Sequence, residues 1–189
     1  MSAPAKLEVL VAPAHSLDSG VQESLEHEVV GLFDQLRERL LRYIVAIGLT
    51  IPDGEEVIQE TFLSLFKHLQ SGKSRDNLQG WLFRVAHNLA LKRCQRARRS
   101  SELLASAAAG TYAAIDPSPS PEDQFANSQA QQRLLAVIQA LPEQDRRCLF
   151  LRAEGLRYRE IAAVLDISLG AVSLSLSRSL TRMARAAQG

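Results

Sequence analysis

The stretch GLRYREIAAVLDISLGAVSLSLSRSL, residues 155–180, predicts two short helices joined by a tight turn. Ile161 and Leu165 lie four residues apart, so both side chains fall on one face of the first helix. Residues 166–168, with the sequence Asp-Ile-Ser, form the predicted turn. Aspartate tolerates left-handed backbone better than most residues, and the Ser168 hydroxyl can cap the helix that follows. We therefore expect a sharp change of chain direction after Leu165.

The second helix of this pair carries an apolar stripe of Val172, Leu176 and Leu180, which we expect to face the protein interior. Together the two helices have the layout of a helix-turn-helix, a motif whose second helix enters the major groove of DNA. Two amphipathic helices with a short turn also occur in proteins that never bind DNA. The rest of the chain is needed to decide between these interpretations.

The composition excludes several classes of protein. The chain of 189 residues has a net charge of +1, so nucleic-acid binding must be argued from the distribution of charge. Its two cysteines, Cys94 and Cys148, form no CxxC pair and have no histidine cluster nearby, which argues against a zinc site or a disulfide framework. No apolar run approaches the roughly 20 residues that span a bilayer, and the N-terminal apolar patch is a poor signal peptide. We expect a cytoplasmic protein with no membrane association and no cofactor.

Helical periodicity dominates the first part of the chain. Apolar residues spaced three and four apart predict a helix over Val21–Gly48, and Gly31 is a point at which it could divide into two. Pro52-Asp53-Gly54 starts a second helix, where Asp53 and Glu56 resemble a capping box. The polar loop SGKSRDN, residues 71–77, separates this helix from a third one over about residues 78–99.

A change of composition divides the chain into two parts. Residues 100–120 are rich in Ala, Ser and Pro and show no sustained period, which is typical of a flexible linker. A helical pattern resumes near Glu122, breaks at Pro142, and continues in helices over residues 143–154, 158–165 and 169–187. The sequence therefore predicts an all-α protein of two small helical domains joined by a flexible linker. The predicted boundaries are 1–20 for a flexible leader, 21–100 for the first domain, 101–127 for the linker and 128–189 for the second domain.

The end of the first domain is basic. The stretch WLFRVAHNLALKRCQRARR, residues 81–99, contains no acidic residue. Such a run is an electrostatic footprint for phosphates, although a solvated helix end can carry the same charges. Trp81 can anchor the helix in the core or form part of a platform for an unstacked base. His87 and Asn88 can hydrogen-bond a base edge or a phosphate, and an ordinary surface histidine is the alternative for His87.

In this order, these segments resemble the extracytoplasmic-function sigma factors of bacterial RNA polymerase, of the sigma-70 superfamily. The resemblance rests on EEVIQETFLSLFKHL (55–69), on the basic stretch at 81–99 and on LPEQDRRCLFLRAEGLRYREIAAVLDISLGAVSLSLSRSL (141–180), and it covers roughly residues 25–100 and 128–186. It implies a sigma region 2-like helical bundle followed by a sigma region 4-like helix-turn-helix domain. Such a protein docks on core RNA polymerase, holds the minus-10 and minus-35 promoter elements, and assists promoter melting. The implied partners are core RNA polymerase and promoter DNA, both duplex and melted; family members commonly also bind an anti-sigma factor, which nothing in this sequence identifies.

The resemblance also implies roles for single residues of the first domain. A docking motif for the polymerase clamp matches residues 56–62, and it assigns polymerase binding to Glu56, where the family usually has Asp, and to Gln59 and Glu60. Residues 81–88 match the segment that reads and opens the minus-10 element, and the loop at 71–79 is where the family captures a flipped-out base. The implied minus-10 and melting residues are Asn77, Trp81, Arg84, His87, Asn88, Lys92, Arg93 and Arg96.

The helix-turn-helix matches the domain that reads the minus-35 element as duplex. The implied DNA-binding residues are Ser168, Ala171, Leu174, Ser175 and Arg178, which face the DNA if the apolar stripe faces inward. Asp166 stands where the family usually has Gly, and the recognition helix lacks the basic residues that are common near its start. We expect Ala171 and Leu174 to contact thymine methyl groups, and the protein to read an unusual or weakly held minus-35 sequence.

Two other functions compete with a sigma factor. A stand-alone helix-turn-helix regulator would bind duplex operator DNA as a symmetric dimer, but it leaves the segment at 56–62 unexplained. An enzyme is disfavoured because the four histidines are scattered, and because neither a nucleophile turn nor a Gly-rich phosphate loop is present in the sequence. We therefore expect a binding and specificity subunit with no catalytic residues.

Overall fold

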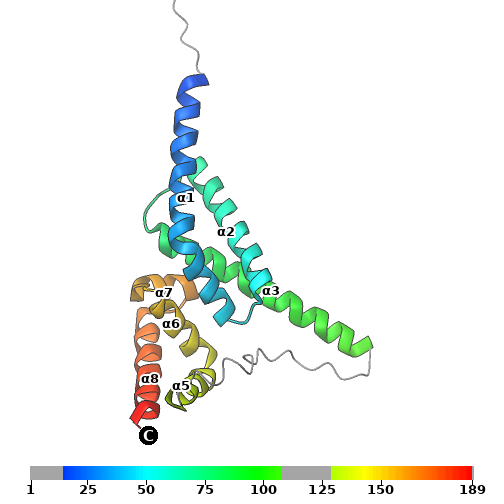
Figure 1. Ribbon diagram of the computed structural model, residues 1–189, viewed down its shortest axis with the longest axis vertical. Coiled ribbons are helices and arrows are strands. Elements are labelled where there is room, and N and C mark those ends of the chain that lie inside the picture. Colours follow the sequence, from blue (N-terminus) through cyan, green and yellow to red (C-terminus); the bar gives the residue numbers. More distant parts are fainter. Residues whose placement is uncertain (1–14, 108–128, 189) are drawn as a thin grey trace, which may run out of the picture.

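The computed structural model describes residues 15–107 and 129–188 (Figure 1), and every regular element in these two ranges is an α-helix. The prediction of an all-α protein is confirmed. The helices are α1 (His15–Ala46), α2 (Ile51–Gln70), α3 (Leu78–Ala107), α5 (Gln129–Gln139), α6 (Glu143–Ala153), α7 (Tyr158–Leu165) and α8 (Leu169–Gln188).

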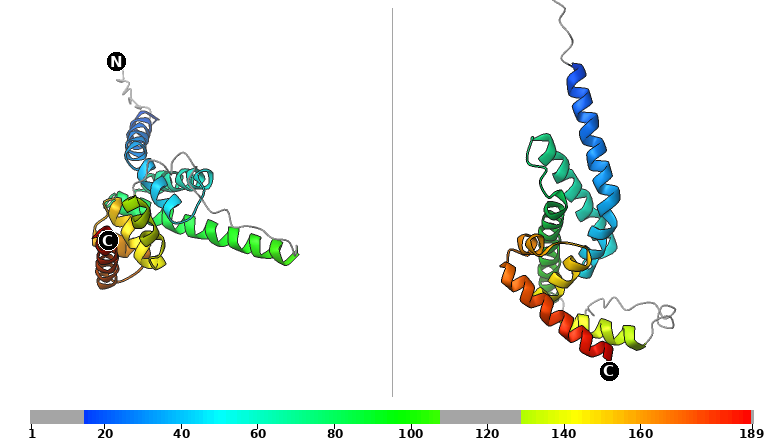
Figure 2. Two further views of the ribbon diagram at one scale, coloured as in Figure 1. Left: turned by 60° about the horizontal axis from the view of Figure 1, so that its bottom comes forward. Right: turned by 90° about the vertical axis from the view of Figure 1, so that its left-hand side faces the viewer.

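Helices α1, α2 and α3 form the first group. Figures 1 and 2 show α1 and α2 side by side, with α3 crossing them and running on beyond the bundle. Leu40 and Ile44 of α1 and Ile58 of α2 are fully buried between the helices. Phe62 of α2 is buried and lies edge-on against Phe33 of α1, with ring centroids 5.0 Å apart.

Two of these helices are longer than their periodicity predicted. Helix α1 begins at His15 instead of Val21, and α3 continues through residues 100–107 instead of ending near Arg99. The added end of α3 has the sequence SSELLASA, whose Ala and Leu residues are good helix formers although they show no sustained amphipathic period. The remainder of the predicted linker, from residue 108, lies outside the described residues.

The cap of α2 lies three residues before the predicted one. Thr50 is the N-cap residue, and its hydroxyl accepts a hydrogen bond from the Asp53 backbone N–H at 3.3 Å. The same hydroxyl donates to the Asp53 carboxylate at 2.6 Å. The predicted capping box of Asp53 and Glu56 is therefore wrong, because the helix has already begun at Ile51. Pro52 lies within its first turn, where the missing N–H of proline costs nothing.

Helices α5 to α8 form the second group, in which α8 packs on both α5 and α6. The turn between α7 and α8 is the predicted one. Asp166 adopts the left-handed conformation with φ of 55°. The Ser168 hydroxyl accepts a hydrogen bond from the Ala171 backbone N–H at 3.1 Å and so caps α8. Both predictions for this turn are confirmed.

The buried face of α8 differs from the predicted stripe. Val172 and Leu176 are buried, but Leu180 is 56% exposed. The interior positions are filled instead by Ser175 and Ser179, both fully buried. The Ser179 hydroxyl donates to the Ser175 backbone oxygen at 2.8 Å, and this local hydrogen bond makes burial of a polar side chain possible. The prediction from apolar residues alone therefore placed the buried face of α8 part of a turn away from its position in the structure.

The two helical groups pack against each other. Helix α7 lies on α3 and α6 touches α1, as the two views of Figure 2 also indicate. Buried residues of both groups, including Phe83 of α3 and Ile161 of α7, belong to one continuous hydrophobic core. Among the described helices, none is by itself long and apolar enough to cross a bilayer, and only the bent pair of α7 and α8 meets that test together, with an angle of 106° between them.

Candidate functional site

A line of polar side chains runs along the exposed face of α3. Arg84, Asn88, Lys92 and Arg96 recur every four residues, which places them on one side of a helix, and all four are exposed. At 1.5 Å per residue the line is roughly 18 Å long. Among the described residues, no acidic side chain forms an ion pair with Arg84, Lys92 or Arg96. This face therefore presents positive charge to the solvent.

The structure brings one residue of this basic helix into contact with the predicted polymerase-binding segment. Arg93 donates to the Glu56 carboxylate at 2.7 Å and lies 3.7 Å from Asp53. Glu56, Gln59 and Glu60 are all exposed on α2. A groove of about 420 Å³ beside this pair is lined by residues of α2, of α3 and of the turn before α2. The two predicted surfaces are thus neighbours, joined by the ion pair of Arg93 and Glu56.

The start of α3 is built around Asn77. This residue adopts the left-handed conformation with φ of 51°, which Asn tolerates better than most residues. Its side-chain oxygen accepts a hydrogen bond from the Gly80 backbone N–H at 3.2 Å. A Cβ at Gly80 would lie only 2.4 Å from the Asn77 side-chain nitrogen, so a larger residue there would displace this amide. Asn77 is exposed, but its side chain already serves the fold.

Trp81 lies half-buried at the edge of the core. Its ring packs against the imidazole of His68, with centroids 4.7 Å apart. His68 Nε2 lies 2.9 Å from the backbone oxygen of Ser74, so this contact also fixes the loop at 71–77. The anchoring role considered for Trp81 agrees with this burial, while one part of the ring is left at the surface.

His87 is not at the surface. It is only 4% exposed, and its Nδ1 lies 2.8 Å from the Tyr43 hydroxyl. Burial, helped by the positive charge of Arg147, lowers the pKa of His87 to about 4, so the ring is neutral near pH 7. Both sequence-based interpretations, a DNA contact and an ordinary surface histidine, are wrong for this conformation. The spacing of Phe83, His87 and Ala90, all buried, is the signal that could have placed it inward.

The predicted DNA-reading face of α8 is partly corrected. Leu174 is 57% exposed, as expected. Ser175 is buried, with its hydroxyl 3.4 Å from the Gln144 side-chain nitrogen, so its predicted outward orientation is wrong. Ala171 is half-buried, and Ser168 is exposed but occupied as the cap of α8. Arg178 donates to the buried carboxylate of Asp145 at 2.8 Å, so its guanidinium is tied to α6.

A contact between the two helical groups escaped the sequence analysis. Arg42 of α1 donates two hydrogen bonds to the Glu154 carboxylate, at 2.9 and 2.8 Å. These residues are more than a hundred positions apart, so no periodicity could pair them.

Within the described ranges, no group of three or more His, Cys, Asp or Glu side chains is placed to hold a metal ion.

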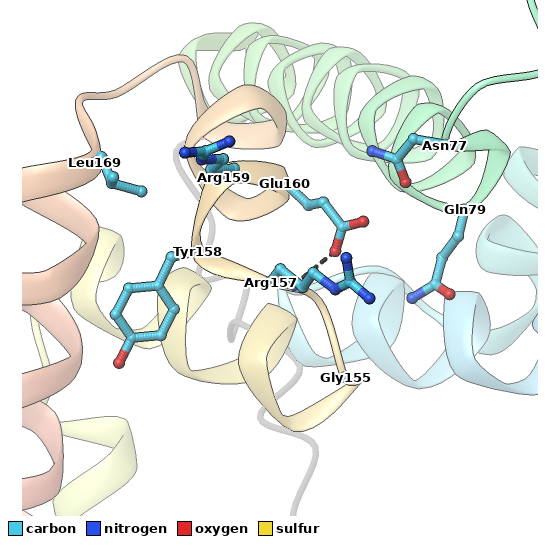
Figure 3. Close-up of a pocket in the computed structure, with 8 residues that line it drawn as sticks. All are labelled: Asn77, Gln79, Gly155, Arg157, Tyr158, Arg159, Glu160 and Leu169. Atoms are coloured by element: carbon cyan, nitrogen blue, oxygen red, sulfur yellow. Dashed lines mark hydrogen bonds between the residues drawn. The ribbon is translucent and has the colours of Figure 1, made fainter.

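An open cleft of about 980 Å³ lies between the start of α3 and the start of α7. Figure 3 shows Asn77 and Gln79 on one wall, with Arg157 pointing toward them from the other. The Glu160 carboxylate accepts a hydrogen bond from the Arg157 backbone N–H at 2.6 Å. Asn77, which the resemblance assigns to base capture, therefore faces the helix-turn-helix across this cleft.

Two protein families match the chain, one in each helical group. Residues 32–100 match the family "Sigma-70 region 2" and residues 131–183 match "Sigma-70, region 4". The ECF RNA polymerase sigma-E factor of Salmonella typhimurium is 31% identical over 137 residues, which are 68% of this chain and 72% of that protein. The ECF RNA polymerase sigma factor SigE of Mycolicibacterium smegmatis is 30% identical over 78% of this chain and 56% of its own length. The probable RNA polymerase sigma factor RfaY of Xanthomonas campestris is 30% identical over 88% of this chain, but only 44% of its own length is covered.

Two solved structures share the fold. The sigma factor RpoE of Bartonella quintana, in complex with the anti-sigma factor NepR, has a TM-score of 0.59 at 19% identity and covers 88% of this chain and 98% of its own. CnrH, in complex with the cytosolic domain of CnrY, has a TM-score of 0.58 at 19% identity over 88% of this chain and 92% of its own. The matches to region 2 and region 4 coincide with the two helical groups.

Proposed function

Because this chain belongs to the extracytoplasmic-function sigma factors, we propose that it binds core RNA polymerase and directs initiation at promoters with particular minus-10 and minus-35 elements. The observation that carries the proposal is the exposed basic line of α3, beside the exposed polar face of α2. A stand-alone regulator has no need of two such adjoining surfaces.

Helix α2 supplies the polymerase-binding surface. Glu56, Gln59 and Glu60 are exposed, while Phe62 of the same motif is buried and fixes the helix on α1. The backbone of this packed helix is pre-organised, so little backbone entropy is lost when the partner binds. Arg93 orients Glu56 through their ion pair, which couples the position of α2 to that of α3.

Helix α3 supplies the surface for the melted minus-10 strand. A line of roughly 18 Å is long enough to contact several successive phosphates of one strand. Arg84, Lys92 and Arg96 contact phosphates, which hold the strand without reading it. The exposed part of Trp81 offers a stacking surface for an unpaired base, worth roughly 1–3 kcal/mol. Binding of the single strand in this way assists melting, because it stabilises the unpaired bases.

Helix α8 reads the minus-35 duplex chiefly through Leu174, which is 57% exposed and is the more exposed of two exposed large apolar side chains, with Leu169, on its first two turns. Such a side chain contacts thymine methyl groups and adds no phosphate contact. Arg178 is held by Asp145 and therefore orients α8 on α6. This arrangement favours a weakly held minus-35 element, with most of the affinity supplied by polymerase.

The test is binding of the purified protein to core RNA polymerase, with a charge reversal in α2. Glu60→Lys is expected to weaken binding about 10-fold or more, because it places a positive charge in the docking surface. Glu26→Lys, an exposed reversal on α1, serves as the matched control and is expected to bind like the wild type. Equal binding of both variants would remove α2 from the interface. Failure of the wild type to bind would contradict the sigma-factor proposal itself.

A further inference from the structure

The loop between α2 and α3, residues 71–77, is fixed at both ends although all of its residues are exposed. At its start, the N–H groups of Gly72 and Lys73 donate to backbone oxygens in the last turn of α2, at 2.9 and 3.4 Å. With φ of +68° at Gly72, these two bonds form a Schellman motif, which ends a helix in one defined direction. At its end, Asn77 fixes the entry into α3. We call residues 71–77 the anchored loop.

The middle of the anchored loop is held by two helices. The Ser74 backbone oxygen lies 2.9 Å from His68 Nε2 of α2, and because a carbonyl oxygen can only accept, this nitrogen donates. Arg75 Nε donates to the Glu28 carboxylate of α1 at 3.1 Å. Between these anchors, the Ser74 hydroxyl accepts from the Asp76 N–H at 3.0 Å and donates to the Asp76 carboxylate at 2.8 Å. A loop held in this way loses little conformational entropy when it binds a ligand.

The anchored loop adjoins the ring that is proposed to stack an unpaired base. The imidazole of His68, which holds the loop, packs against Trp81, and the Trp81 N–H donates to the Asn77 oxygen at 3.0 Å. Stacking on an aromatic ring accepts every base, because every base has a π-face. Discrimination between bases therefore requires hydrogen-bonding groups at fixed positions beside the ring. The loop carries exposed hydroxyl, amide and charged side chains that can serve this purpose.

We propose that Glu28, acting through Arg75, is a positioning residue for base selection, because it fixes the polar groups of the anchored loop beside a base stacked on Trp81. The selection of bases rests on the proposed function, whereas the anchoring of the loop does not. Glu28 lies outside residues 32–100, which match region 2. Its carboxylate also occupies the Arg75 guanidinium, which would otherwise be free to bind phosphate. Phosphate contacts carry no sequence information, so the ion pair favours selectivity over affinity.

The anchoring is tested on the purified protein by hydrogen exchange of the loop amides. In Glu28→Ala, exchange at residues 73–76 is expected to become about 3-fold faster; the effect is modest because exposed ion pairs are weak, and Arg75 is 56% exposed. Glu26→Ala, an exposed position on the same helix, is the matched control and should exchange like the wild type. The charge swap of Glu28→Arg with Arg75→Glu re-forms the pair and should restore slow exchange. Unchanged exchange in Glu28→Ala would overturn the anchor.

Base selection is tested with the polymerase-bound protein and fluorescent single-stranded oligonucleotides that carry each base, or an abasic site, at successive positions. At the position where the wild type discriminates most, Glu28→Ala is expected to reduce the ratio between the weakest and the tightest dissociation constants about 3-fold. Binding of the abasic strand should not weaken, and the charge swap should restore the ratio.

Two results would overturn the positioning role of Glu28. One is an unchanged ratio in Glu28→Ala, or an equal loss of affinity for all strands. The other is a wild type that binds polymerase but discriminates between bases at no position. Failure of the wild type to bind polymerase would instead contradict the proposed function, and the exchange comparison would still decide whether Glu28 anchors the loop.

Discussion

Asp145 and Arg178 form an ion pair whose two partners differ sharply in exposure. The Asp145 side chain is 1% exposed and the Arg178 side chain 49%, with their oxygen and nitrogen 2.8 Å apart. Among the described residues, the second carboxylate oxygen of Asp145 has no hydrogen-bond partner. The buried carboxylate thus depends on Arg178 for a hydrogen bond and for a neutralising charge, whereas the guanidinium can be solvated by water without Asp145.

This asymmetry predicts unequal costs for removing the two partners. Arg178→Ala leaves an unpaired buried charge and is expected to lower the free energy of unfolding by about 3 kcal/mol. Asp145→Asn keeps a hydrogen-bond acceptor of the same shape and is expected to cost about 1 kcal/mol. Urea unfolding of the two variants measures the difference. Equal costs would show that the pair is not the support of α8 described above.

Leu174 and Ser175 are adjacent in sequence but are expected to respond oppositely to the same substitution. Leu174→Arg places a charge on the exposed face of α8, so the change in unfolding free energy should stay within about 0.5 kcal/mol. Its effect should instead appear as an altered sequence preference in binding to a library of duplex minus-35 sites. Ser175→Arg forces a charge into the packed interface with α6 and is expected to cost more than about 3 kcal/mol. An unchanged preference for Leu174→Arg would count against a DNA contact at that position.

The basic line of α3 predicts a particular salt dependence. If Lys92 and Arg96 each contact one phosphate of a single strand, each alanine variant should reduce the slope of log K against log salt by about 0.7. The measurement is titration of fluorescent single-stranded DNA with the polymerase-bound protein at several salt concentrations. Lys67→Ala, an exposed lysine on α2, is the control and should leave the slope unchanged. Slopes that are equal in all variants would place the strand elsewhere.

His87 predicts a loss of stability in mild acid. Its pKa is about 4 in the folded protein against 6.5 for an unperturbed histidine, so the unfolded chain binds more protons between these values. The stabilising contribution of the neutral ring is complete above pH 6.5 and is lost as the pH falls toward 4. This contribution to the free energy of unfolding is on the order of 3 kcal/mol. His87→Gln should show a correspondingly weaker dependence of unfolding free energy on pH between 6.5 and 4, and an identical dependence would contradict the burial of a neutral His87.

Much of the fold follows from local signals. The turn at Asp166 and the cap at Ser168 were predictable because both depend on the backbone preferences of single residues. The bounds of α6, α7 and α8 agree with their predictions to within a residue, since Pro142 and the turn residues mark their ends. The exposed positions of α2 were also predictable, because Phe62 fixes which face turns inward.

The parts that could not be predicted depend on packing between distant segments. Ser175 is polar, and only the close approach of α6 explains its burial. His87 is neutral because it is buried, and its ring nitrogen is satisfied by the hydroxyl of Tyr43 on another helix. The pairing of Arg42 with Glu154 arises from the docking of two helical groups, for which neither periodicity nor capping gives a signal. Such contacts emerge only in the folded chain.

Promoter-specific initiation by this protein is tested most directly by transcription from a promoter library with core RNA polymerase and the purified protein. We predict that polymerase alone initiates without selection, and that adding the protein yields transcripts from a subset of promoters sharing minus-10 and minus-35 sequences. No binding to polymerase and no selective transcripts, together with tight binding of a dimer to duplex DNA, would contradict the account and identify a stand-alone regulator.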